Sequence, residues 1–153
     1  MYLAELNLAR LIQPLDHPDS ADFANNLDRI NVLADRMPGF VWRFQDESGN
    51  ATSVQAFDDP MVIVNMSVWE TPEDLERFVW GTIHRKFYER RDEWFQKMSS
   101  HHFVMWWVEE GHQPDLAEAK AKLEHLRAHG PSEEAFGWAD LASARLWERS
   151  RCA

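Results

Sequence analysis

One histidine of the sequence stands where it could take part in chemistry. His84 lies one helical turn after Trp80 and one before Tyr88, in a segment whose apolar residues repeat at helical spacing. A histidine beside an apolar helical stripe can face a pocket between helix and sheet, where a pKa near neutrality suits a general base. The same ring could bind a haem iron. A structural histidine that hydrogen-bonds a neighbouring strand is the other interpretation.

Three polar residues are set within segments that otherwise read as strands. Asn7, Asn65 and Arg43 each stand among apolar neighbours. A pocket that orients a carbonyl group or an oxyanion needs a few such donors between apolar walls. We therefore expect Asn65 and Arg43 to assist His84 in catalysis and Asn7 to bind substrate. Each could instead satisfy a bulge or pair across a subunit interface.

Tryptophan is unusually frequent, with 8 Trp and 9 Phe against 2 Tyr. Trp42, Trp69, Trp106 and Trp107 all fall in expected strands. Because neighbours in a strand alternate between faces, Trp106 and Trp107 must point to opposite sides of the sheet. We expect Trp42, Trp69 and Trp106 to form aromatic walls for a flat substrate or a porphyrin. Ordinary core packing is the alternative for these indoles.

A basic segment, His84 to Lys86 together with Arg90 and Arg91, interrupts an acidic chain. Arg91 is the residue that we expect to hold an anionic group of a ligand. The alternative is a solvated helix face that pairs with Glu89, Asp92 and Glu93. No HxH or HExxH spacing is present, so we expect no metal site.

The composition narrows the classes of function. The formal net charge of −10 disfavours nucleic acid and anionic membrane surfaces as partners. The apolar run at 103–108 is too short to span a bilayer, and the N-terminus lacks the pattern of a signal peptide. The only cysteine is Cys152, so no disulfide can form within the chain. These features favour a cytoplasmic protein.

The elements needed to position these residues follow from periodicity and from breaks at Pro, Gly and Asp. Strands are expected at 2–11, 40–45, 52–57, 61–69 and 103–108, with a short one at 136–138. Helices are expected at 21–37, at 72–98 behind a Thr71 cap, and from Asp115 to Gly130. The core of this order is β-α-β-β-α-β. It predicts an α+β, ferredoxin-like antiparallel sheet with helices on one face.

The second face of that sheet needs a cover. The segments 61–69 and 103–108 are apolar on both sides, so both faces of the sheet should be buried. The simplest cover is another copy of the chain, which would give a dimeric α+β barrel. With 153 residues, we expect one domain at 1–140 and a C-terminal arm or frayed tail at 141–153.

The sequence also carries a resemblance. The run from Asn65 to Phe78, followed by Thr82-Ile83-His84, resembles the antibiotic-biosynthesis-monooxygenase-like superfamily of dimeric α+β barrels. Over roughly residues 3 to 138 the chain resembles one bacterial family in that superfamily, which carries only an unknown-function label. The matching features are Ala4 to Asn7, Pro38 to Arg43, Asp46 to Thr52, Asn65 to Glu70, Arg90 to Phe95, Trp106 to Val108, and Gly111-His112 with Pro114.

The resemblance implies three functions. The first is cofactor-independent oxygenation of a small aromatic compound in a dry pocket, with His84 as the base and Asn65 and Arg43 orienting the anion. The second is a haem-binding or haem-processing protein with His84 as axial ligand. The third is a ligand-binding homodimer without turnover.

Overall fold

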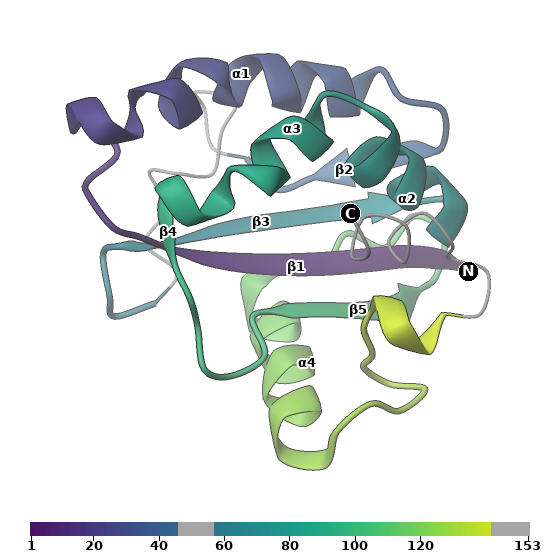
Figure 1. Cartoon of the computed structure of the whole chain (residues 1–153). Helices are drawn as coiled ribbons and strands as arrows, with labels where there is room; N and C mark the ends of the chain where they lie inside the picture. The colour runs from purple at the N-terminus through teal and green to yellow at the C-terminus, as the bar shows by residue number, and fades with distance from the viewer. Residues whose placement is uncertain (46–56, 142–153) are drawn as a thin grey trace.

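The computed structural model describes residues 1–45 and 57–141. A central sheet separates helices α1, α2 and α3 on one side from helix α4 on the other (Figure 1). The strand expected at 52–57 and the arm expected at 141–153 lie almost wholly outside the described residues.

The sheet has the strand order of a ferredoxin-like fold. Its strands are β1 (Tyr2–Leu11), β2 (Phe40–Arg43), β3 (Val62–Trp69), β4 (Phe95–Gln96) and β5 (Phe103–Val108). Strand β3 lies between β2 and β1, and both β4 and β5 pair with the far edge of β1. Every pairing is antiparallel. The predicted fold class is therefore confirmed.

The described part of the chain contains four α-helices. They are α1 (Ala21–Asp35), α2 (Pro72–Gly81), α3 (His84–Glu89) and α4 (Leu116–His129). Short 3-10 turns occur at Pro18–Ser20, Arg91–Glu93 and Trp138–Asp140. The short strand expected at 136–138 is reduced to a single bridge between Met105 and Phe136.

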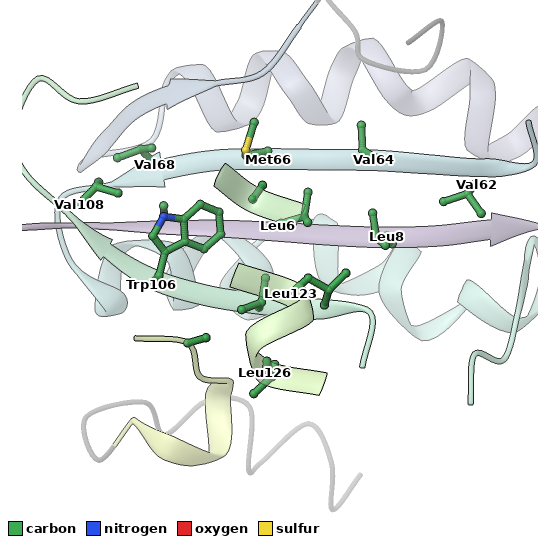
Figure 2. Close-up of a cluster of buried hydrophobic side chains, with 14 residues drawn as sticks. Leu6, Leu8, Val62, Val64, Met66, Val68, Trp106, Val108, Leu123 and Leu126 are labelled. Atoms are coloured by element: carbon green, nitrogen blue, oxygen red, sulfur yellow. The ribbon is translucent and has the colours of Figure 1, made fainter. Parts of the chain in front are cut away.

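One face of the sheet packs on α4. Alternate residues of β1, including Leu6 and Leu8, point to this face with Val64 of β3. Leu123 and Leu126 of α4 complete the cluster (Figure 2). All five side chains are at most 4% exposed in the single chain, so this face is dry without a second subunit.

The other face packs on α1 and α2. Leu3 and Trp69 are register partners at this face. They join one apolar cluster with Ala34 of α1 and with Leu75 and Phe78 of α2. Two clusters of buried residues therefore lie on opposite sides of the sheet, one for each layer of helices.

These clusters correct two details of the sequence analysis. Helices were expected on one face, but α4 covers the other (Figure 1). Burial of that second face consequently does not require a twin subunit. The stripe of Ala119, Leu123 and Leu126 supplies the apolar surface that we had assigned to a partner.

The helix expected at 72–98 is also wrong in its extent. The Thr71 cap is confirmed, because the backbone N–H of Asp74 donates to Thr71 Oγ1 at 3.2 Å. The helix ends at Gly81, and Thr82 is extended. The Thr82 hydroxyl donates to the Phe78 carbonyl at 2.6 Å and accepts from the His84 N–H at 3.2 Å. The side chain thus replaces the helical backbone bonds at this point.

The importance of α4 can be tested by truncating its central side chain. Leu123→Ala removes a side chain that is 1% exposed, so we expect the free energy of unfolding to fall by about 2–5 kcal/mol. Urea denaturation measures this difference. The control Ala121→Ser, at an exposed position of α4, should change stability by less than about 0.5 kcal/mol. Equal effects of the two substitutions would contradict the packing described here.

Dimerisation, which the family resemblance implies, stays a prediction. Sedimentation equilibrium of the full chain is expected to give the mass of two chains. A single-chain mass at high protein concentration would contradict it, and the burial by α4 explains how a lone chain could then stay folded.

Candidate functional site

A cavity of about 490 Å³ lies between the sheet and helices α1 and α3. Its walls come from β1, β3, the end of β2, one face of α1, α3 and the segment that follows α3. Cavities of this size hold small organic ligands in other proteins. His84, Asn65, Arg43, Asn7 and Arg91, which were predicted from separate parts of the sequence, all line it.

Two asparagines stand on the sheet side of the cavity. Asn7 of β1 and Asn65 of β3 are register partners, so their side chains leave the same face of the sheet side by side. Both are exposed although their strands are inner strands. Neither amide has a hydrogen-bond partner within the described part of the chain. The pair therefore offers donors and acceptors to a ligand.

The structure defines the tautomer of His84. Its Nδ1 lies 3.2 Å from the carbonyl oxygen of Val79. A carbonyl oxygen only accepts, so Nδ1 must carry the hydrogen. In the neutral ring Nε2 is then unprotonated and can accept a proton.

Burial disfavours the charged form of the same ring. It lowers the pKa of His84 below its ordinary value, and the bond to the Val79 carbonyl opposes this effect only in part. The ring also contacts Phe78, with ring centroids 5.0 Å apart. His84 is the first residue of α3, not the middle of a long helix, and Thr82 holds its backbone in place.

Arg43 reaches the cavity from the end of β2. Its Nε donates to Asp35 Oδ1 of α1 at 2.7 Å, and its Nη2 donates to Asp35 Oδ2 at 3.3 Å. The side chain is 11% exposed. This ion pair joins β2 to α1, which gives Arg43 a structural role beside its predicted catalytic one.

Aromatic rings form another part of the cavity wall. Phe23 of α1 lies against Trp94 and Phe95, with ring centroids at 5.7 Å and 5.0 Å. Phe87 of α3 stacks on Trp94 at 6.0 Å. All four line the cavity. Such a wall suits a flat aromatic ligand.

The predicted tryptophans are not part of this wall. Trp42, Trp69 and Trp106 all lie outside the cavity lining. Trp42 and Trp106 belong to the cluster on the α4 side of the sheet, and Trp69 is fully buried beside Phe78. Core packing, the alternative interpretation, therefore describes their places in the structure. Trp106 and Trp107 were predicted to point to opposite sides of the sheet. Their exposures agree with this, since Trp106 is 1% exposed and Trp107 is 38% exposed.

Glu5 is a buried acid that the sequence analysis did not single out. The Ser67 hydroxyl donates to Glu5 Oε1 at 2.6 Å and accepts from Trp69 Nε1 at 2.9 Å. Burial raises the pKa of Glu5 to about 8, although the bond from Ser67 favours the charged form. Glu5 is thus a neutral carboxylic acid near pH 7. Its alternation with Asn7 on one strand face was the available signal.

Within the described residues, no three His, Cys, Asp or Glu side chains gather as they would around a metal ion. In the same part of the chain, no helix combines the length and apolar character needed to cross a membrane. The arrangement instead provides an unprotonated imidazole nitrogen, paired amides and an aromatic wall around one cavity. These groups can bind a small aromatic molecule and accept a proton from it.

A family model described as "Domain of unknown function (DUF3291)" matches residues 2–152. The predicted relation to a family with an unknown-function label is confirmed. A crystal structure from Chloroflexus aurantiacus J-10-fl, provisionally named an antibiotic biosynthesis monooxygenase, superposes with a TM-score of 0.46 and 16% identity. The match covers 74% of this chain and 98% of that chain. No curated protein sequence matches this one.

The charge state of Glu5 predicts a pH dependence of stability. Between pH 4.5 and about 8 the folded chain keeps a proton that the unfolded chain has released. The free energy of unfolding should therefore fall with rising pH, by roughly 1.4 kcal/mol per pH unit from this group. Glu5→Gln removes this contribution. We therefore expect the free energy of unfolding of the variant, relative to that of the wild type, to rise from pH 5 to pH 8.

Urea denaturation of both proteins at several pH values measures that growing difference. Other groups, including His84, titrate alike in the two proteins and cancel in the comparison. A constant difference between pH 5 and pH 8 would show that Glu5 is already charged in the folded chain.

Proposed function

The chain belongs to the family described as a domain of unknown function (DUF3291), and we propose that it is a small-molecule enzyme of the antibiotic-biosynthesis-monooxygenase-like type. Its reaction is cofactor-independent oxygenation of a small aromatic compound. His84 is the general base, and Asn65, Asn7 and Arg43 orient the substrate anion. The observation that supports this proposal most directly is the bond from His84 Nδ1 to the Val79 carbonyl, in a wall of the cavity.

Proton abstraction is the step that these residues can perform. A phenol that enters the cavity gives its O–H proton to Nε2 of His84 and becomes a phenolate. The lowered pKa of His84 keeps this nitrogen unprotonated at neutral pH, before substrate arrives. The amides of Asn7 and Asn65 can donate to the phenolate oxygen, which stabilises the charge that forms.

The phenolate then supplies the electrons for oxygenation. A ring carbon of the anion bonds to dioxygen, the O–O bond breaks, and that carbon keeps one oxygen as a carbonyl. The second oxygen leaves as water with the phenolic hydrogen and the hydrogen of that carbon. The phenol is oxidised to a quinone and dioxygen is reduced, so no further reductant is needed. The aromatic wall limits water near the reacting anion.

A haem-binding role uses the same nitrogen and is the second candidate. A histidine that ligates a metal usually donates its other ring N–H to a carbonyl or carboxylate, as His84 does toward Val79. His84 would be the axial ligand, and bound haem would supply redox chemistry with oxygen. A ligand-binding chain without turnover is the remaining alternative, and the experiment below separates all three.

Oxygen uptake with 1-naphthol as the probe tests the proposed enzyme. The wild-type chain should consume dioxygen and release 1,4-naphthoquinone without added cofactor. His84→Ala removes the base, so we expect the rate to fall by about 100-fold or more, while binding of the naphthol persists. The control His129→Gln, at an exposed position of α4, should keep the wild-type rate.

The other outcomes identify the alternatives. A Soret band that appears on adding haem and is absent in His84→Ala would favour the haem protein. Binding of 1-naphthol by both proteins without oxygen uptake would favour a binding protein. An equal rate in wild type and His84→Ala would refute the assignment of His84 as base.

A further inference from the structure

The cavity carries charged groups that the proposed reaction does not use. Arg91, Asp92 and Lys97 all line it, close together in the chain after α3. Their formal sum is one positive charge, in a chain whose net charge is −10. A local excess of positive charge in a strongly acidic protein favours an anion beside these lining residues.

The other arginines near this segment are already paired with carboxylates of the chain. Arg90, next in the chain, donates to both Glu93 and Asp22, at distances from 2.7 to 3.0 Å. Arg85 is likewise paired with Glu89 at 2.9 Å. Arg43, the other arginine of the cavity, is paired with Asp35.

Arg91 differs from these arginines. Its Nη1 donates to the backbone carbonyl of Tyr88 at 2.9 Å, and its Cζ lies 4.1 Å from the centre of the Tyr88 ring. Within the described residues it has no carboxylate partner, and neither does Lys97. The contacts with Tyr88 fix one edge of the guanidinium and leave other N–H donors for a ligand.

The surroundings favour a ligand that is both aromatic and anionic. Phe87 and Trp94 stack on each other and line the same cavity. Arg91 and Lys97 are exposed, and a bound aromatic ring that covers the wall would exclude part of the water beside them, which strengthens a charge pair. A carboxylate also matches the planar donor fork of an arginine.

We infer that the cavity takes an aromatic monocarboxylate, whose carboxylate is bound by Arg91 and Lys97 and whose ring lies against the aromatic wall. This inference rests on the proposed function only in using the same cavity, and it narrows the substrate class to hydroxylated aromatic acids. Arg91 and Lys97 then determine specificity, whereas His84 performs the chemistry.

Calorimetric titration with 2-naphthoate and with 2-naphthamide tests the inference. The two probes have nearly the same shape and differ in charge. The wild-type chain should bind the acid about tenfold or more tightly than the amide, as expected for a charged hydrogen bond. Arg91→Gln and Lys97→Gln should each remove most of that preference and leave the affinity for the amide unchanged. Lys86→Gln, at an exposed position of α3 outside the cavity lining, should keep the preference.

Each contrary result overturns the inference. Failure of 2-naphthoate to bind, equal affinity for both probes, or a preference that survives in Arg91→Gln and Lys97→Gln would each do so. The amide affinity shows that the variants keep a folded cavity. Because binding is measured without turnover, the same preference in His84→Ala would uphold the inference even if the proposed oxygenation failed.

Discussion

The register between β1 and β3 is the constraint on which the rest of this structure depends. Glu5 opposes Ser67 and Asn7 opposes Asn65, so these polar residues share one face of the sheet. Leu6 and Leu8, which alternate with them along β1, then point to the α4 side. A slip of β1 by one residue would turn its side chains to the opposite faces. It would place the Glu5 carboxyl and the Asn7 amide against α4, and it would leave apolar side chains of β1 beside Asn65 on the cavity side. The burial of the α4 face therefore holds the candidate site in register.

The break between α2 and α3 places His84 at the cavity that Asn7 and Asn65 also line. A continuous helix would carry residues 82–98 onward in the direction of α2. Instead, Thr82 ends α2 through its own hydroxyl, and α3 begins at His84. The Nδ1 of His84 then returns to Val79, in the last turns of α2. The backbone distortion and the orientation of the ring thus have the same local cause. Side-chain competition for backbone carbonyls is the physical basis of the site's geometry.

The sequence predicted those parts of the fold that depend on periodicity. The bounds of β1, β3 and β5 agree within one residue with the strands expected at 2–11, 61–69 and 103–108, and Thr71 caps the helix that was expected to start there. It could not show that a threonine hydroxyl would outcompete the helix at Thr82, since the apolar stripe continues past it. Nor could it show which sheet face α4 would cover. The polar site residues were found because polar side chains are rare within apolar strands, whereas buried tryptophans are equally consistent with core packing.

Glu5 and His84 are a buried acid and a base that form no ion pair with each other. Burial raises the pKa of Glu5 and lowers that of His84, so both are neutral near pH 7. They lie at the two ends of a chain of contacts through Ser67, Trp69 and Phe78. When His84 takes a proton, a positive charge forms where burial disfavours it, and no nearby carboxylate in this chain of contacts is ionised to balance it. In the proposed reaction the substrate anion that forms would balance this charge, so proton transfer to His84 would depend on an acidic ligand.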